Sequence, residues 1–390
     1  MNVDALTEGM DRYAGRGVTT YADWFRGEGR LVGVYRRGQG KDAWRLLAYG
    51  LEYRQRLGAV RLDLVLPHEA ARHSAMRVAL LDPQLDIHLH VQDAKQQLTL
   101  IDPMELDEAI GAYRQLGGIG QRPDPDDISP LPPWLQELAD WVETRRVERI
   151  RMRGYYSWHF RGRQVLRVRR STGTWELTAG VAYKTPTGNQ PTVRTVGKDG
   201  PLSDGDTEAL RAAIDDAIEN RRIGKDRGHR ESLLQAAIGV DPATIGLMTV
   251  DREVPAWRPQ GRGKIDFLGF DEDGRPHVVE TKIGPDPQLG IQGLDYWAWT
   301  RAHQREFVDG LVDGQGDVDA EPSIRFVLGT SNKALLHAAA AATLEAIRPT
   351  IDWRVQVIQD WDMLDPTKHL LRPSVAERLR PRTLPDRAKT

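Results

Sequence analysis

The sequence predicts an α/β protein in three parts: an amino-terminal α/β domain, a β-rich basic middle module, and a carboxyl-terminal α/β domain. Three observations support this. A chain of 390 residues exceeds one small core. The run Gln121 to Pro133 holds five prolines and three aspartates in thirteen residues, which excludes regular structure there. Apolar residues with strand spacing alternate with helical spacing on both sides of that run.

The composition indicates a folded chain, with 40% hydrophobic and 28% charged residues. We place the amino-terminal domain at residues 1–121, the middle module at 134–200 and the carboxyl-terminal domain at 203–364. Residues 365–390 are expected to be a basic tail, since Lys368 to Thr390 carries seven basic and two acidic residues.

The amino-terminal domain shows alternating apolar residues, typical of strands, in three stretches separated by helical spacing. The strands are expected at 31–35, 61–66 and 87–91, and the helices at 42–57 and 68–80. The middle module begins with a short helix from Trp134, followed by strands at 165–168 and 175–183 around a Ser-Thr-Gly turn.

The carboxyl-terminal domain is expected to run helix, three strands, helix, strand, helix, strand. Ser203 or Asp204 caps a helix that reaches about Arg222, and a second helix follows from Arg230 to Ile238. The strands are expected at 247–257, 264–271, 277–282, 323–329 and 351–358, and the later helices at 289–307 and 333–347.

Composition also excludes several kinds of site. Cysteine is absent, so there is no disulfide, thiolate metal site or cysteine nucleophile, and any metal must bind oxygen or imidazole. The first residues lack a basic start followed by an apolar run, and no apolar stretch approaches membrane-spanning length, so we expect a cytoplasmic protein. The net charge of -2 does not indicate a nucleic-acid binder, so that function needs local clustering.

Such a cluster lies between Arg145 and Arg170, which holds ten arginines and one acidic residue. Aromatic residues are interleaved with them, and this mixture suits phosphate contacts and stacking on bases. An equally weighted alternative is a pair of amphipathic strands whose arginines face solvent or pair with acidic residues. The predicted nucleic-acid-binding residues are Arg145, Arg146, Arg149, Arg151, Arg153, Tyr155, Tyr156, Trp158, Arg161, Arg163, Arg167, Arg169 and Arg170.

Charged residues interrupt two predicted strands of the carboxyl-terminal domain. Asp266 lies in one apolar strand, and Glu280 and Lys282 lie two apart on the next, so they project from the same face. Charges among apolar neighbours are unfavourable unless they are paired or bind a metal. Two carboxylates suit Mg²⁺ or Mn²⁺, to which a phosphodiester could add its oxygens, and Lys282 could orient a water or stabilise negative charge.

These residues resemble the PD-(D/E)XK superfamily of restriction-endonuclease-like nucleases. The resemblance rests on Asp266, on Glu280-Thr281-Lys282 and on Glu231 of the preceding helix, over about residues 225 to 360. It implies a restriction-endonuclease-like αβββαβαβ fold, catalysis by these residues, and metal binding by Asp266, Glu280 and Glu231. Gln292 and Tyr296 form a Gln-x-x-x-Tyr arrangement like that of the exonuclease-type branch. There Gln292 would seat the lysine or a phosphate, and Tyr296 would line the site and contact nucleic acid.

Structural explanations stand beside these roles. Asp followed by Glu-x-Lys is a loose pattern that ordinary hairpins contain by chance. Glu231 could simply be a carboxylate favoured by the helix dipole. Tyr296 and its neighbouring tryptophans could be the apolar face of a helix packed on the sheet.

The amino-terminal domain contains a segment that resembles the nuclease-like region. Gly15 to Gly38 resembles Gly261 to Gly284, which predicts a degenerate copy of the same fold; the alternative is an unrelated α/β domain. In that alignment Thr20 stands for Asp266, Tyr35 for Glu280 and Arg37 for Lys282. Such a copy would lack metal ligands.

The sequence therefore predicts a Mg²⁺- or Mn²⁺-dependent nuclease that hydrolyses phosphodiester bonds, with DNA favoured over RNA. Repair or defence against foreign DNA is the expected role, and the chain could act as a homodimer or with a partner protein. Two alternatives are a catalytically silent or partner-dependent nucleic-acid-binding subunit and a hydrolase of small phosphoesters.

Overall fold

The computed structural model divides the chain into two compact units, each described here by itself. The first contains Met1–Ile119 and Ile245–Gln359, and the second contains Gly120–Thr244. The structure describes residues 1–13, 22–36, 43–118, 131–152, 155–171, 173–180, 192–197, 200–222, 230–311, 316–330 and 336–359.

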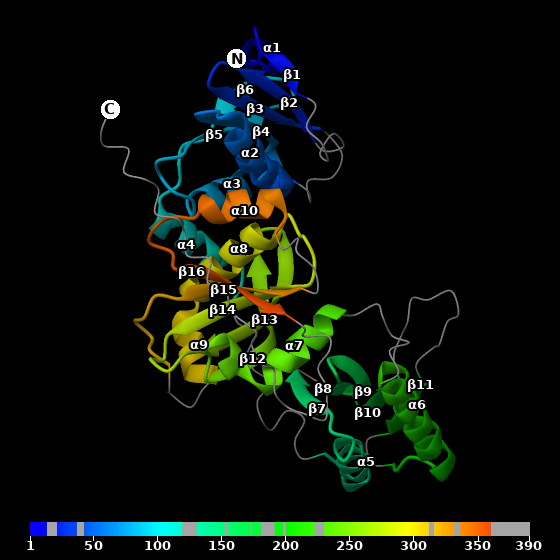
Figure 1. The fold of residues 1–390 in the computed structure, drawn as a ribbon. Coiled ribbons are helices and arrows are strands. Elements are labelled where there is room, and N and C mark those ends of the chain that lie inside the picture. Colours follow the sequence, from blue (N-terminus) through cyan, green and yellow to red (C-terminus); the bar gives the residue numbers. More distant parts are fainter. Residues whose placement is uncertain are drawn as a thin grey trace. The chain divides into compact units, whose positions relative to one another are not determined.

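The first unit holds two sheets with helices on the connections between their strands (Figure 1). The elements of its amino-terminal half are α1 (Val3–Leu6), β1 (Asp11–Tyr13), β2 (Ala22–Gly27), β3 (Arg30–Tyr35), α2 (Ala43–Leu57), β4 (Arg61–Pro67), α3 (His68–Val78), β5 (Asp86–Gln92), β6 (Leu98–Leu100) and α4 (Leu106–Gln115). The elements of its carboxyl-terminal half are β12 (Thr249–Arg258), β13 (Gly261–Phe270), β14 (Pro276–Lys282), α8 (Leu289–Ala302), α9 (Gln304–Leu311), β15 (Ser323–Thr330), α10 (Ala338–Glu345) and β16 (Trp353–Gln359).

The strands of each half lie in the sheet in chain order. The amino-terminal order is β1-β2-β3-β4-β5-β6, and the carboxyl-terminal order is β12-β13-β14-β15-β16. In both, the first three strands are antiparallel and the next two pairings are parallel. Parallel neighbours need a crossover connection, and α2, α3, α8 and α10 supply it.

One hydrophobic core joins the two halves of the first unit. It contains residues of α2, β4, α8 and β15 together, including Tyr53, Leu64, Trp297 and Phe326. Helix α8 has apolar residues on every side and is buried along almost its whole length, as expected of a helix in the middle of a core. A break at His303 separates it from α9, where the sequence predicted one helix to Phe307.

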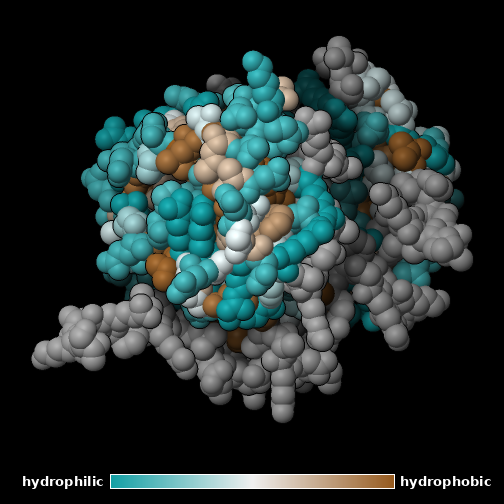
Figure 2. Space-filling model, turned by 90° about the horizontal axis from the view of Figure 1, so that it is seen from above, coloured by the Kyte–Doolittle hydropathy of each residue, from teal (hydrophilic) through white to brown (hydrophobic). Residues whose placement is uncertain are grey.

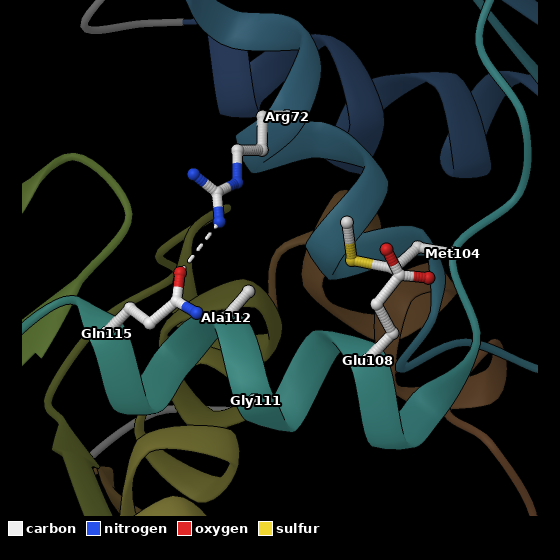
Figure 3. Close-up of a pocket in the computed structure, with 6 residues that line it drawn as sticks. All are labelled: Arg72, Met104, Glu108, Gly111, Ala112 and Gln115. Atoms are coloured by element: carbon white, nitrogen blue, oxygen red, sulfur yellow. Dashed lines mark hydrogen bonds between the residues drawn. The ribbon is translucent and has the colours of Figure 1, made fainter.

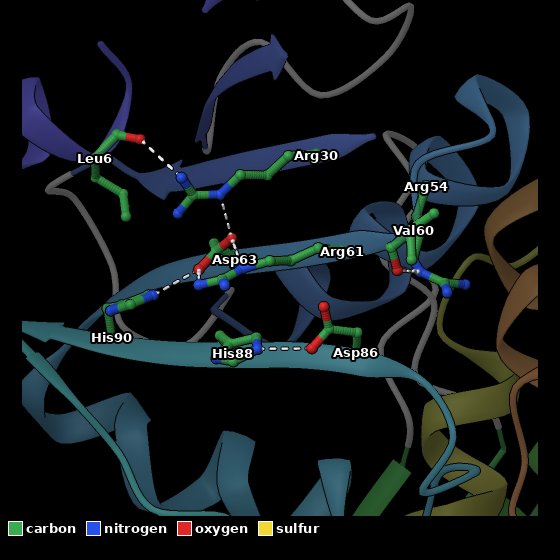
Figure 4. Close-up of polar contacts among 9 residues, drawn as sticks. All are labelled: Leu6, Arg30, Arg54, Val60, Arg61, Asp63, Asp86, His88 and His90. Carbon is green, nitrogen blue, oxygen red and sulfur yellow. Dashed lines mark hydrogen bonds and ion pairs between the residues drawn. The ribbon is translucent and has the colours of Figure 1, made fainter. Parts of the chain in front are cut away.

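A second, smaller cluster covers the other face of the amino-terminal sheet, where a carboxylate is also buried. Asp63 of β4 is fully buried and accepts hydrogen bonds from Arg30 Nε at 2.7 Å, Arg61 Nε at 2.8 Å and His90 at 2.8 Å (Figure 4). Burial opposes ionisation, but these three neighbours hold the pKa of Asp63 far below its usual range.

The second unit contains a five-stranded antiparallel sheet in the order β11-β10-β9-β8-β7. Leu166, Val168 and Leu177 of this sheet share a core with Leu210 and Ile214 of a long helix. The elements are α5 (Pro133–Glu143), β7 (Glu148–Met152), β8 (Tyr155–Phe160), β9 (Arg163–Ser171), β10 (Thr174–Ala179), β11 (Thr192–Gly197), α6 (Asp204–Arg222), α7 (Arg230–Val240) and, at its border, the 3-10 helix η3 (Pro242–Ile245).

The unit border differs from the predicted start of the carboxyl-terminal domain at residue 203. Helix α6 buries Leu210, Ile214 and Ile218, and this apolar face packs on the sheet of the second unit. The sequence identified the helix and its apolar face correctly. It could not show which sheet that face covers, and the five strands at 249–359 belong to the first unit without it.

Among the described residues, no helix has both the length and the apolar character needed to span a bilayer. Figure 2 shows one face of the molecule, on which hydrophilic residues predominate and the apolar residues form small separate patches.

Candidate functional site

The structure places Asp266 and Glu280 on adjacent antiparallel strands, as the sequence predicted. Phe267 of β13 pairs with Val279 of β14, and Asp266 and Glu280 are the next residues beyond that last pair. The backbone N–H of Asp266 donates to the Glu280 carboxylate. Glu280 is 2% exposed, and Lys282, two residues further on β14, keeps 16% of its side chain exposed. The three charges therefore lie on two neighbouring inner strands of the sheet.

Thr281, which sequence reasoning missed, fixes the Asp266 carboxylate. Its backbone N–H and its hydroxyl donate to Asp266 Oδ2 at 2.8 and 2.7 Å. Two donors on one carboxylate oxygen fix the orientation of the Asp266 side chain.

Glu280 lies in a strongly perturbed environment. Burial raises its pKa well above the ordinary glutamate value, and the Asp266 charge adds to this, while Lys282 and Arg258 act in the opposite direction. Its Oε1 is buried without a hydrogen-bond partner among the described residues. A buried carboxylate oxygen without a donor is a costly feature that calls for an explanation.

Gln292 and Tyr296, the predicted Gln-x-x-x-Tyr pair, lie on α8. Gln292 Oε1 is a second buried oxygen without a partner among the described residues. Tyr296 is 2% exposed, and its hydroxyl accepts a hydrogen bond from the backbone N–H of Lys264 at 3.1 Å. A Cβ on Gly263 would lie 2.5 Å from that hydroxyl, so glycine is required there. Tyr296 thus fastens α8 to β13 and offers no exposed ring to nucleic acid.

Two further residues near the carboxylates have no counterpart in the sequence prediction. The Arg258 guanidinium lies over the Tyr296 ring, 5.4 Å from its centroid. Glu253 lies opposite Asp266 on β12, and its backbone has the left-handed φ of 54°, which is strained for a residue with a side chain. Neither residue belongs to the predicted motif, so only the geometry identifies them.

Glu231 lies in the first turn of α7, which belongs to the second unit. Its role as a metal ligand beside Asp266 and Glu280 remains a prediction. Within the described part of the chain, no group of three or more His, Cys, Asp or Glu side chains is placed to hold a metal ion.

The aromatic residues of the arginine-rich segment are mainly structural. Tyr156, Trp158 and Phe160 of β8 are 5%, 0% and 7% exposed and belong to the core of the second unit, whereas Tyr155 is half-buried. Buried rings cannot stack on bases, so Tyr156 and Trp158 do not form the expected stacking surface. Their spacing of two along a strand was the sign of this burial.

Several of the predicted arginines pair within the unit. Arg145 contacts Asp215 at 2.8 Å, Arg149 contacts Glu143 at 3.4 Å, and Arg167 contacts Glu176 at 3.5 Å. Arg146, Arg169 and Arg170 are exposed, and Arg161 and Arg163 are half-buried. Arg153 and the side chain of Arg151 lie outside the described residues.

Two pockets of the first unit contain none of the predicted site residues. The first, of about 350 Å³, is lined by Arg72, Met104, Glu108, Gly111, Ala112 and Gln115, with Arg72 and Gln115 hydrogen-bonded at 3.1 Å (Figure 3). The second, of about 480 Å³, lies between α4 and α8 and includes Arg114, Arg301 and Glu321. Both are mixed polar and apolar hollows without convergent catalytic groups.

Comparisons with known proteins do not identify a family for this chain. No family model and no curated protein matches the chain. Among solved structures, a repair endonuclease from Pyrococcus abyssi is 18% identical over 57% of this chain and 95% of its own, with a TM-score of 0.18. A complex of EndoMS with double-stranded DNA is 16% identical over 52% and 72%, with a TM-score of 0.18, and EndoMS in apo form is 14% identical over 60% and 95%, with a TM-score of 0.15. TM-scores this low support no conclusion about function. A functional proposal must therefore rest on the residues of the site.

Proposed function

We propose that the chain is a divalent-metal-dependent nuclease that hydrolyses phosphodiester bonds in DNA, in repair or in defence against foreign DNA. One observation carries the proposal: the buried Glu280 faces Asp266 across adjacent strands, with Lys282 two residues beyond on the same strand. Apolar neighbours make this arrangement costly for a purely structural hairpin.

The oxygens present suit Mg²⁺ or Mn²⁺. Asp266 and Glu280 would hold the ion. Glu280 Oε1, which accepts no hydrogen bond among the described residues, fits such a role. Glu231 is the third predicted ligand, and a cation of this kind also recruits waters and phosphate oxygens. When bound, the ion supplies Lewis-acid polarisation of the phosphate and a more acidic water.

The protein's own residues would position the reaction. Thr281 holds the Asp266 carboxylate in one orientation, and Tyr296 fastens α8 against β13. Lys282 would stabilise the negative charge that develops on the phosphate. Gln292, whose Oε1 lacks a partner among the described residues, would orient a water or the lysine.

Binding of the DNA backbone would fall to exposed arginines of the second unit. Arg146, Arg149, Arg169 and Arg170 are the members of the predicted set that are exposed among the described residues, and Arg149 already lies 3.4 Å from Glu143. Their contribution would weaken with added salt, because phosphate contacts release counterions.

A second candidate is a DNA-binding subunit that has this fold but does not cut alone. The observation that favours it is the absence, among the described residues, of a group of three potential metal ligands. Salt-sensitive DNA binding without cleavage in Mg²⁺ or Mn²⁺ is the result expected of such a subunit.

The test is cleavage of linear, circular, single-stranded and duplex DNA by the full chain in Mg²⁺ and in Mn²⁺. Asp266→Ala and Lys282→Ala are each expected to lower the rate at least about a thousand-fold, near 4 kcal/mol of transition-state stabilisation. The matched control is Glu272→Ala, which removes an exposed carboxylate from the turn of the same hairpin and should leave the rate unchanged. Circular dichroism would confirm that all variants fold. Equal rates in wild type and both site variants would refute the proposal.

A further inference from the structure

The two halves of the first unit have the same strand order and direction. β1 to β5 and β12 to β16 each form two antiparallel pairings followed by two parallel pairings. The crossover helices also match: α2 and α8 follow the third strand, and α3 and α10 follow the fourth. Among the described strands, β6 is the only addition to this shared pattern.

Backbone hydrogen bonds join the halves reciprocally just after α3 and α10. The N–H of Asp82 donates to the carbonyl of Ala346 at 2.8 Å, and the N–H of Arg348 donates to the carbonyl of Leu80 at 3.0 Å. Leu81 and Ile347 form the bridge between them. Every antiparallel bridge has this reciprocal pattern and relates its two segments by a local two-fold axis, and here the two segments follow corresponding helices.

This bridge fixes which residues of the halves correspond, because strand pairing carries the register across each sheet. Counting along both chains from Leu81 and Ile347 without a gap leads to β5 and β16. The corresponding residues of the neighbouring strands then follow from the strand pairing in each sheet. The corresponding residues are Ile87 and Trp353, Leu62 and Ile324, Leu31 and Val278, Gly33 and Glu280, Phe25 and Phe267, and therefore Trp24 and Asp266.

Glycines in the first crossover helices confirm this register independently. A Cβ on Gly50 of α2 would meet Leu62 and Leu64 at 3.1 and 3.3 Å, and a Cβ on Gly293 of α8 would meet the corresponding side chains, Ile324 at 3.2 Å and Phe326 at 2.4 Å. Each helix therefore approaches the same two strand positions at a glycine. Counting along the helices from these glycines pairs Tyr53 with Tyr296 and Tyr49 with Gln292.

Aromatic side chains fill the place in the amino-terminal half where the carboxylates lie in the other. Trp24 is 2% exposed, and a Cβ on Gly33 would lie 2.5 Å from its indole ring, so the ring occupies the space above Gly33. Tyr53 contacts the Trp24 ring edge-on at 5.1 Å, Tyr13 at 5.4 Å and Tyr49 at 6.2 Å. Tyrosine at the Tyr53 and Tyr296 position is the one element of the site that both halves share.

The structure therefore revises the alignment drawn from sequence. Trp24, not Thr20, corresponds to Asp266, and Gly33, not Tyr35, corresponds to Glu280. Tyr35 then corresponds to Lys282; Thr20 and Arg37 lie outside the described residues. The cause is the turn: Glu28 and Gly29 alone join β2 to β3, whereas five residues join β13 to β14.

We propose that residues 1–118 are a second copy of this fold, closed by Trp24, and that the chain is an internal pseudodimer with one cleavage centre. Because the surface around the two-fold axis is already used within the chain, one polypeptide acts alone and cuts one strand of duplex DNA per encounter. This strand count rests on the proposed function. An ordinary two-fold dimer of nucleases would present two centres, one for each strand.

The experiment follows supercoiled plasmid in Mg²⁺ with the full chain at substoichiometric concentration. The first product is expected to be the nicked circle, with linear DNA appearing only later, from independent second cuts. Linear DNA formed together with the first nicked circles would overturn the single-centre inference. No cleavage of any substrate would instead overturn the proposed function.

A second measurement tests the closed copy without using activity. Gly33→Ala should lower the melting temperature of the wild-type chain, because the new methyl group meets the Trp24 indole. In a Trp24→Leu background the same substitution should lower it by less than half as much. Equal shifts in the two backgrounds would show that Trp24 does not fill the site, whether or not the chain cuts DNA.

Discussion

The two halves of the first unit bury opposite charges at the same position of their fourth strand. In the register above, Asp63 of β4 corresponds to Arg325 of β15, and both are almost fully buried. Asp63 is neutralised by two arginines and His90 (Figure 4), whereas Arg325 donates to His277 Nδ1 at 3.0 Å. The same position of the sheet can hold a negative or a positive side chain when the neighbouring side chains provide matching hydrogen-bond partners. Any buried charge needs such partners.

The faces of the two sheets that are covered by α2 and α8 also differ in their residues at corresponding positions. One half keeps carboxylates, a lysine and an amide around Tyr296, and the other replaces each of them with glycine or an aromatic ring around Tyr53. An aromatic cluster stabilises the fold through burial, whereas carboxylates with incomplete hydrogen bonding cost stability. The comparison predicts that substitutions at corresponding positions have unlike effects in the two halves.

The largest difference is expected between Asp295 of α8 and Glu52 of α2, which correspond. Asp295 is fully buried and holds Arg77 of α3 through contacts of 2.9 and 2.8 Å. Asp295→Asn leaves that arginine charged, buried and poorly paired, so we expect the free energy of unfolding in urea to fall by about 3–5 kcal/mol. Glu52 is 13% exposed and lies 3.6 Å from Arg56 one helical turn away, and Glu52→Gln should cost less than about 1 kcal/mol.

An exposed ion pair formed by Arg301 of the same helix, α8, provides the control for that measurement. Arg301 and Glu321 lie 2.9 Å apart and are each 41% exposed, so Arg301→Ala should change stability by under about 1 kcal/mol. If Asp295→Asn cost no more than this control, the buried ion pair would not hold α3 to α8.

The next effect in size concerns pH, which should act on the two halves in different windows. Burial lowers the pKa of His277 to about 4, assisted by the Arg325 charge and opposed by Asp271. His277 is thus neutral when folded, with Nε2 facing Asp271 and Nδ1 accepting from Arg325. Its stabilising contribution is complete above the unfolded pKa near 6.5 and is lost as pH falls toward 4, by about 3 kcal/mol at most.

Asp63 responds at lower pH. Its folded pKa is depressed, so its contribution is present above the unfolded value of 3.8 and is lost only in stronger acid. From pH 7 to pH 4.5 the unfolding free energy should therefore decline more in wild type than in His277→Gln; Glu280, whose raised pKa acts in the opposite direction over this range, contributes equally to both chains. An unchanged slope in that variant would assign the decline to other groups.

Sequence predicted the parts of this protein that depend on local pattern. The spacing of two between Glu280 and Lys282, on the strand after that of Asp266, was enough to predict that the three charges lie together. Strands β4, β5, β13 and β14 begin and end within three residues of their expected bounds. Contacts between segments that are distant in the sequence could not be predicted from local pattern. Strand alternation predicts that Thr281 points away from Glu280, so nothing in the spacing revealed that its N–H and hydroxyl would hold Asp266.

The same limit explains the middle module and the repeat. Arginines beside aromatic rings suggested a binding surface, but only the packing of Leu210 and Ile214 against the sheet shows that Trp158 is core. For the repeat, a short turn in one hairpin and a long one in the other shifted the alignment by two residues on β3. The order of the strands, however, is as the repeat hypothesis required.

The smallest effect is expected at the corresponding residues Gln292 and Tyr49, and it separates catalysis from stability. Gln292 Oε1 makes no hydrogen bond among the described residues, so Gln292→Ala should leave the melting temperature nearly unchanged. Its cleavage rate should fall about ten- to hundred-fold, equivalent to about 1.4–2.7 kcal/mol, through lost positioning. Tyr49→Ala should instead lower the melting temperature and leave the cleavage rate nearly unchanged, because Tyr49 packs against Tyr53 and His337 and lies in the closed half.

A fall in cleavage with Tyr49→Ala as large as that with Gln292→Ala, at temperatures where both variants are folded, would mean that the amino-terminal half takes part in the chemistry. The two halves would then be working sites of one enzyme rather than one site and its closed copy.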